Sequence, residues 1–432
     1  MEGELVGVLG FLALVALLLL RVPVGIAMIA VAVGGYAMVV TPEAALARLG
    51  SDAFGGASDY GISVIPLFIL MGLLLAQANL GRDVYAMFDA LLWRLRGGLA
   101  LATVGASTLF GSVSGSAMAS SSTMSVVAIP EMRRYGYDDG LASATTAVGG
   151  TLGMLIPPSA VLVLYGVLTE ESIGRILVGG LVPGLLTAGL LMLTAWILVR
   201  ARPELAPETG DRERPRFWPA LLRTWAGPVI FGLSIGGIYF GVFTPTEAGA
   251  AGAFLALLYA LGSRRLGLQG LGQAVSQTVR VSAMIFLVII AGKMFGFFLS
   301  ATGIPRTLSQ FVADLDVAPF LVIAVIFAIY FLLGAFMDEI AILTIMTPMM
   351  YPIVISLGYD GIWFGVISVM MLLTGLLTPP VGLVSFVVSG ISQIPIGTVF
   401  RGVAPFWIAL IIAVLLAVAF PEIVLTLPAL MD

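Results

Sequence analysis

Two doubled prolines, Pro157-Pro158 and Pro379-Pro380, interrupt apolar stretches of this sequence. Proline lacks a backbone N–H and clashes with the preceding helical turn, so each pair leaves carbonyl oxygens without a helical donor. In apolar surroundings these carbonyls, in 153–158 and 375–381, must meet protein groups, water or an ion. Several neutral oxygens suit a hard cation. The sequence therefore predicts two related cation sites; the simpler alternative is a helix kink satisfied by serines or water.

Two turns are expected to face the doubled prolines. The first is the polar run from Gly111 to Ser116, and the second lies near Gly334. Hydroxyl groups near these turns and the second proline pair can add ligand oxygens. They belong to Ser112, Ser116, Thr374 and Thr378. The neighbouring run Ser120-Ser121-Ser122 is explained either by close helix packing or by further ligand contacts.

Few ionisable residues fall within the apolar regions. Asp338 follows the second turn and is the first candidate for a functional carboxylate, because a charge there needs water, a partner or a ligand. Its alternative role is an N-cap of the next helix. Glu247 is expected in the first turn of a helix. Lys293, the only lysine, is expected to snorkel, to pair with a carboxylate or to contact a ligand.

The elements that hold these residues must lie in a membrane. Of the 432 residues 60% are hydrophobic and 10% charged, and apolar runs near the length of a membrane span recur throughout. The first run, 5–20, lacks a basic leader and a cleavage signature, so we expect a retained helix. The absence of cysteine and histidine excludes disulfides, thiolate chemistry and histidine metal sites. Nothing in the net charge of −4 indicates a nucleic-acid partner, and nothing indicates an organic cofactor.

The two halves of the sequence repeat at a constant spacing, called the repeat offset below, which is the spacing from Pro157 to Pro379. Five of the seven prolines up to Pro183 have a proline at this offset, and Gly136-Tyr137-Asp138 recurs there as Gly358-Tyr359-Asp360. Shared use of proline and glycine as helix punctuation is the alternative, but the tripeptide favours an internal duplication. The charged, proline-containing stretch 200–224 separates the two halves.

Arginines orient the two halves, because arginine near membrane ends is biased to the cytoplasmic side. The segment 97–130 has arginines at both ends, at Arg94, Arg96, Arg133 and Arg134. It is therefore predicted to be a re-entrant hairpin that enters from the cytoplasm. The matching segment 318–352 has no Lys or Arg close by and is flanked by Asp314, Asp316 and Asp360, so it is predicted to enter from outside. The arginine-rich linker is predicted to be cytoplasmic.

The predicted fold is an all-α polytopic membrane protein of two inverted-topology repeats. Repeat 1 is 1–199, with a hairpin at about 97–130 and a broken helix at about 138–168. A cytoplasmic linker, 200–224, leads to repeat 2 at 225–432, with a hairpin at about 318–352 and a broken helix at about 360–392. Spans are expected at 5–20, 23–40, 62–80 and 174–199, and short amphipathic arms at 83–95 and 306–315. In inverted repeats, substrates bind near the midplane on broken helices.

Four runs carry a family resemblance: GSVSGSAMASSSTMSVVAIPEMRRYGYD, GGTLGMLIPPS, FTPTEAGA and TGLLTPPVG. They resemble the large membrane subunit, DctM-like, of TRAP transporters, the tripartite ATP-independent periplasmic type. The resemblance covers essentially the whole chain. It implies sodium-driven import of an organic acid by an elevator mechanism, in which a transport domain with both hairpins moves against a scaffold.

The resemblance also implies where sodium binds. Its two sodium sites would have ligands at Ser112, Gly115, Gly153, Ile156 and Pro158 in repeat 1 and at Gly334, Gly375, Thr378 and Val381 in repeat 2. For the substrate, we predict contacts from Ser114, Ser116, Asp338 and Thr374. Because no arginine is obvious in the hairpins, the substrate carboxylate is expected to meet backbone donors at the N-termini of short helices.

The resemblance implies partners as well. They are a small four-helix membrane subunit, expected as a separate chain, and a periplasmic substrate-binding protein that delivers a dicarboxylate, a sialic-acid-like compound or another carboxylate. Membrane lipid would surround the chain in the cytoplasmic (inner) membrane of a bacterium or archaeon. The nearest rival function is a single-component sodium/dicarboxylate symporter.

Two further rivals come from other classes. An intramembrane aspartyl protease is suggested by Tyr137-Asp138 and Tyr359-Asp360, although these aspartates are expected at opposite membrane ends, too far apart to share a proton. A channel is disfavoured because two inverted hairpins suit alternating access better than a continuous pore.

Overall fold

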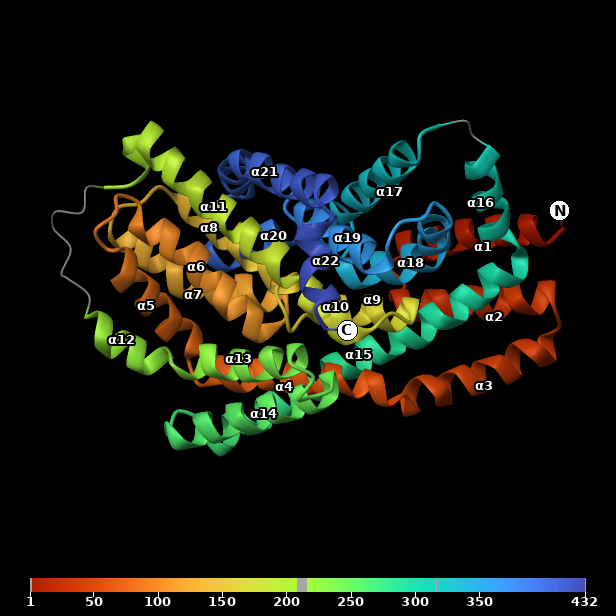
Figure 1. Cartoon of the computed structure of the whole chain (residues 1–432), viewed down its shortest axis with the longest axis horizontal. Coiled ribbons are helices and arrows are strands. Elements are labelled where there is room, and N and C mark those ends of the chain that lie inside the picture. Colours follow the sequence, from red (N-terminus) through yellow and green to blue (C-terminus); the bar gives the residue numbers. More distant parts are fainter. Residues whose placement is uncertain (1, 208–215, 315–316, 432) are drawn as a thin grey trace.

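The computed structural model describes residues 2–207, 216–314 and 317–431, and these residues form helices and turns without strands (Figure 1). The first half contains α1 (Glu2–Leu19), α2 (Val24–Val39), α3 (Pro42–Ser58), η1 (Tyr60–Ser63), α4 (Val64–Gln77), α5 (Leu80–Leu92), α6 (Gly98–Ser114), α7 (Ala117–Arg134), α8 (Asp139–Thr151), η2 (Leu152–Met154), α9 (Ala160–Thr169), α10 (Ile173–Gly179) and α11 (Leu181–Ala201). The remainder contains η3 (Pro203–Leu205), α12 (Phe217–Thr224), α13 (Ala226–Tyr239), α14 (Pro245–Gly262), α15 (Leu268–Thr302), α16 (Ile304–Asp314), α17 (Pro319–Gly334), α18 (Glu339–Ser356), α19 (Gly361–Gly375), α20 (Leu383–Ser392), α21 (Ile396–Ala419) and α22 (Glu422–Ala429).

Helices of the two halves match at the repeat offset found in the sequence. The first and last residues of α7, 117 and 134, correspond at this offset to the first and last residues of α18, 339 and 356. The halves differ where α3, η1 and α4 correspond to the single helix α15. In the first half the side chain of Asp59 accepts a hydrogen bond from Gly61 N at 2.8 Å and starts a new 3-10 turn, which ends α3.

Several helices have the length and composition of membrane spans. Within the described residues, five stretches qualify, namely Tyr60–Gln77, Ile173–Ala201, Leu268–Thr302, Glu339–Ser356 and Ile396–Ala419. A sixth arises if α12 and α13, bent by 43°, count as one span. The expected spans at 5–20 and 23–40 coincide with the shorter apolar helices Gly3–Leu19 and Val24–Val39. The chain is thus a multi-pass membrane protein by its helices.

Eight helices, α6–α9 and α17–α20, form a group that we call the hairpin body. Its centre is buried, since every residue of α8 from Gly140 to Thr151 is buried. Small residues permit this close approach. For example, a Cβ added to Gly149 would lie 2.8 Å from the Cβ of Ser107 in α6. The helices α1–α4 and α13–α15, called the outer helices below, pack mainly on one another, α14 on α4 and α15 on α2.

Each half of the hairpin body is bonded to the other half. Helix α7 packs on α20, and α18 packs on α9. Arg133 at the end of α7 donates to Ser392 O at 3.0 Å, at the end of α20. In the converse contact, Tyr351 of α18 donates to Glu171, just after α9, at 2.7 Å. The hairpin body is therefore one interlocked unit built from both halves.

The expected surface segments are partly helical. The arms near 83–95 and 306–315 fall on α5 and α16, which lie toward opposite ends of the long axis (Figure 1). Helix α12 lies within the expected linker 200–224. Residues 208–215, with Arg212 and Arg214, and residues 315–316 lie outside the described residues.

Candidate functional site

The first hairpin turns at two residues between α6 and α7. Gly115 adopts φ +64°, which favours glycine, and its N–H donates to Gly111 O at 2.8 Å. Ser116 then caps α7, because its side chain accepts a hydrogen bond from Ala119 N at 3.3 Å. These two residues therefore account for the sharp reversal predicted from the polar run.

The doubled proline of the first half follows the end of α8. After η2 the chain passes through Pro157-Pro158, whose peptide bond is cis, and restarts as α9. Ser159 caps the new helix by accepting from Leu162 N at 3.1 Å. The helix is thus broken where the missing N–H groups of the prolines predict, and two helix N-termini, of α7 and α9, lie beside the hairpin turn.

The hairpin turn lies directly against this break. A Cβ on Gly111 would lie 2.8 Å from Gly153 Cα, and a Cβ on Gly115 would lie 2.5 Å from Pro158 O. Two backbones approach this closely only through glycine. Within the described residues, the buried carbonyls of Ile156 and Pro158 accept no backbone or side-chain hydrogen bond. Two carbonyl oxygens of the broken segment therefore lie beside the hairpin turn without donors.

The second hairpin repeats the arrangement with different bonds. The turn between α17 and α18 contacts the break between α19 and α20, where Pro379-Pro380 is also cis. Ala335 O accepts from the N–H groups of Val381 and Gly382, both at 3.2 Å. A Cβ on Gly334 would lie 3.1 Å from Gly375 Cα. We call the contact of the first hairpin turn with the Pro157-Pro158 break crossing 1. The contact of the second turn with the Pro379-Pro380 break is crossing 2.

All nine residues predicted as sodium ligands lie at the two crossings. The hydroxyl of Ser112 donates to Leu109 O at 2.8 Å, and that of Thr378 donates to Thr374 O at 2.8 Å. A hydroxyl that donates one bond keeps its lone pairs for a cation. The side chain of Ile156 packs on Gly184 of α11, which leaves its carbonyl as the group available to an ion.

The predicted substrate contacts are spread more widely. Ser114 Oγ donates to Gly111 O at 3.3 Å, and Ser116 caps α7. Asp338 is the counterpart of Ser116 at the repeat offset and caps α18 in the same way, accepting from Ala341 N at 3.0 Å. The buried Thr374 donates to Met370 O at 2.9 Å and also lines a cavity of about 550 Å³ between α17, α19 and α21.

Glu339 was not among the predicted site residues. Its side chain is 6% exposed, and within the described part of the chain its Oε2 atom has no hydrogen-bond partner. A buried carboxyl oxygen without a partner is costly. The sequence shows only that Glu339 follows Asp338 in the turn; its burial depends on how α18 packs against α9 and α15.

The other two ionisable candidates have structural partners. Lys293 Nζ lies 3.6 Å from Asp59 Oδ2, as expected for pairing with a carboxylate. Glu247 forms a capping box with Thr244 at the start of α14. Asp138 and Asp360 each cap a helix, accepting from Leu141 N at 3.0 Å and from Trp363 N at 2.9 Å.

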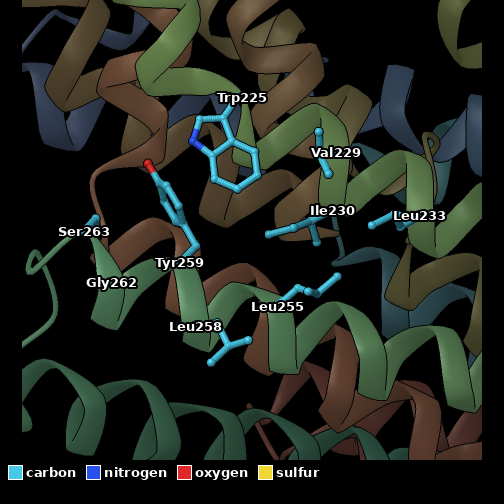
Figure 2. A pocket seen from close by; sticks show the side chains of 9 residues that line it. All are labelled: Trp225, Val229, Ile230, Leu233, Leu255, Leu258, Tyr259, Gly262 and Ser263. Atoms are coloured by element: carbon cyan, nitrogen blue, oxygen red, sulfur yellow. The ribbon is translucent and has the colours of Figure 1, made fainter.

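Cavities outside the crossings differ in chemistry. One of about 490 Å³ lies between α13 and α14, with apolar side chains around Trp225 and Tyr259 (Figure 2). Another of about 340 Å³, with Asp52, Glu170 and Lys293 in its lining, lies where the outer helices face α18. Across the described residues, acidic side chains form no group of three or more that would hold a metal.

The whole chain is related to transporter permeases. Residues 11–423 match the family described as tripartite ATP-independent periplasmic transporter, DctM component. The sialic acid TRAP transporter large permease protein SiaM of Vibrio cholerae is 32% identical, over 100% of this chain and 99% of that protein. The C4-dicarboxylate large permease DctM of Pseudomonas aeruginosa is 34% identical, over 87% of this chain and 88% of that one.

A solved structure shares the fold at low identity. The YdaH transporter of Alcanivorax borkumensis aligns with a TM-score of 0.66 and 14% identity, covering 88% of this chain and 89% of that chain. This likeness concerns the fold alone. The family match over most of the chain, together with the two permease relatives, shows that the chain belongs to the DctM components of tripartite ATP-independent periplasmic transporters, and it is a transporter permease.

Proposed function

We propose that the chain imports a small organic acid through the cytoplasmic (inner) membrane by sodium symport. A periplasmic binding protein delivers the acid, and a small membrane subunit, a separate chain, completes the transporter. Relatives are named for sialic acid, C4-dicarboxylates and isethionate, and each of these solutes is a small anion. The observation that carries the proposal is the pair of matched crossings, where backbone carbonyl oxygens and helix N-termini lie side by side.

Each crossing offers one sodium ion a set of neutral oxygens. In crossing 1 the oxygens come from Ser112, Gly115, Gly153, Ile156 and Pro158. In crossing 2 they come from Gly334, Gly375, Thr378 and Val381. Neutral carbonyl and hydroxyl groups bind a hard cation without the cost of burying a second charge. The ion would supply the positive charge that the crossings themselves lack.

The same crossings suit an anion on their other side. Helices α7, α9, α18 and α20 all begin at a crossing, so four helix N-termini present N–H groups there. An N-terminus favours negative charge, and so does a sodium ion close by. The substrate carboxylate would therefore bind between the two turns, near Ser114, Ser116, Asp338 and Thr374. Occupied sodium sites would raise its affinity, which couples the two solutes.

The mechanism is an elevator in which the hairpin body moves past the outer helices. The body is interlocked across its two halves, as Arg133 and Tyr351 illustrate, whereas its contacts with the outer helices include the polar cavity beside Lys293. The two repeats cross the membrane in opposite directions, so each hairpin faces its own side. A rigid body of this kind can carry both sodium sites and the substrate together.

Reconstitution into liposomes tests the function. We expect uptake of the organic acid only with the small subunit, the loaded binding protein and an inward sodium gradient. Uptake by this chain alone would favour the single-component symporter and contradict the tripartite assignment. Uptake that persists when potassium replaces sodium would contradict sodium as the coupling ion. It would leave the family membership intact.

A further inference from the structure

A small cavity, lined partly by polar residues, lies away from the two crossings. It measures about 230 Å³ and lies where α11 ends and where α8 and α21 begin. Its polar lining residues are Asp138, Arg202, Thr398 and Arg401. Leu198, Leu205 and Pro405 supply an apolar part of the wall.

The backbone holds this cavity in a fixed shape. Gly402 of α21 lies against Gly140 of α8 so closely that a Cβ on Gly402 would collide with Gly140 O. Asp138 N donates to Leu205 O at 3.1 Å, which ties the start of α8 to the segment after α11. The three helix ends that carry the polar groups are therefore fixed relative to one another.

The guanidinium groups of Arg202 and Arg401 have fewer partners than those of nearby arginines. Arg133 is bonded to Asp139, Arg96 donates to Pro203 O at 3.2 Å, and Arg200 stacks 4.3 Å from the Trp196 ring centre. Within the described residues, Arg202 has no side-chain partner. Arg401 uses only Nε, which donates to Gly397 O of its own helix at 3.0 Å. Both side chains are exposed, so the cavity is open to a ligand.

The carboxylate of Asp138 does not cancel this positive charge. It accepts from Leu141 N at the start of α8, where the helix N-terminus balances a negative charge. The lining then carries two guanidinium groups against one carboxylate that is already bound. The Thr398 hydroxyl, which has no hydrogen-bond partner in the described chain, adds a neutral donor.

We propose that this cavity binds the phosphate group of an anionic phospholipid such as phosphatidylglycerol. Two guanidinium groups on facing helices bind phosphate oxygens with paired N–H groups, and basic pockets between membrane helices favour such headgroups. The apolar wall meets the first part of the acyl chains. The proposal does not depend on the transported solute, because it concerns a multi-pass membrane protein and this cavity alone.

Native mass spectrometry of the full chain tests the proposal. The chain is purified in neutral detergent with equal amounts of phosphatidylglycerol and phosphatidylcholine, and the lipid retained on the protein is counted. We expect wild type to retain phosphatidylglycerol preferentially. Arg202→Gln and Arg401→Gln should each weaken retention roughly fivefold, the ratio that one basic contact supplies. Arg306→Gln, an exposed arginine in α16, is the matched control and should leave retention unchanged.

Further measurements separate the possible outcomes. The lysine pair Arg202→Lys/Arg401→Lys keeps the charge and should retain an intermediate amount of lipid. Equal retention of the two lipids by wild type overturns the proposal, and this result needs no variant to fold. A different result would be that millimolar inorganic phosphate stabilises the chain only when both arginines are present, while the chain shows no preference for phosphatidylglycerol. This result would assign the cavity to free phosphate and overturn the proposed lipid.

Discussion

Glycines decide how closely each turn approaches its broken helix. At crossing 1 the contact is Gly111 with Gly153, and at crossing 2 it is Gly334 with Gly375. A side chain at any of these positions would push the turn away from the carbonyls that face it. The geometry of the two proposed ion sites therefore depends on residues that would contribute only backbone oxygens, or none.

Gly115→Ala tests this dependence. The new Cβ would lie 2.5 Å from Pro158 O at φ +64°, so both backbone strain and a collision oppose it. We expect the free energy of unfolding to fall by about 2–5 kcal/mol and sodium-dependent uptake to be lost. Gly136→Ala is the control, because it shares a positive φ, +74°, but has no atom within 4 Å of the new Cβ. In Gly136→Ala the free energy of unfolding, measured by thermal unfolding, should fall by only about 1–2 kcal/mol. Equal effects at the two positions would contradict close packing at crossing 1.

Thr378→Val removes one hydroxyl from crossing 2 with little change of shape. If Thr378 Oγ1 is a sodium ligand, the sodium concentration for half-maximal uptake should rise roughly fivefold, as expected for one lost oxygen contact. Thr194→Val in α11 is the control, since its hydroxyl also donates to a carbonyl four residues earlier, at 2.8 Å for both threonines. An unchanged sodium dependence in Thr378→Val would remove this side chain from the site.

At the scale of helices, the breaks at the doubled prolines were more predictable from the sequence than the ends of the hairpin helices. The doubled prolines indicate both breaks because two adjacent residues lose their donors. The hairpins, by contrast, extend beyond the expected ends near 130 and 352, to Arg134 and Ser356, because Pro130 and Pro352 lie inside continuous helices. The contact of Arg133 with Ser392 could not be predicted, since it joins residues 259 apart in the sequence. Such a contact depends on how the two halves pack.

This contact links three helices of the hairpin body. Arg133 binds both oxygens of Asp139, at 2.6 and 2.9 Å, and Ser392 O at 3.0 Å. The side chains of the Arg133–Asp139 ion pair are both about 40% exposed. Arg133→Gln should therefore lower the free energy of unfolding by only about 0.5–1 kcal/mol. Uptake should fall as α20 loosens from α7. Arg134→Gln, whose side chain is 71% exposed beside Glu131, should leave both unfolding and uptake unchanged. Equal loss in both variants would indicate a general charge effect instead.

At the scale of the whole molecule, the repeat offset predicts which helices correspond but not how the halves join. Prolines and glycines mark matched breaks in the two halves, so α7 and α18 were expected as counterparts. Nothing in the spacing indicates that α7 packs on α20, or α18 on α9. Those contacts unite the hairpin body and leave it bordered by α15, so motion of the body must change the contacts between α15 and α18.

A pair of engineered cysteines tests that motion, since the natural sequence has none. A Cβ on Gly296 of α15 would lie 3.5 Å from Pro348 Cβ of α18, within disulfide range. Oxidation of Gly296→Cys/Pro348→Cys should stop uptake, because it ties the body to an outer helix, and a reductant should restore it. The control pair, Gly56→Cys/Ile290→Cys, joins α15 to α3 at a Cβ separation of 3.9 Å. Both of its helices are outer helices, so its disulfide should form without stopping uptake. Full uptake with the first pair oxidised would mean that α15 and α18 keep their contact throughout transport, which an elevator does not allow.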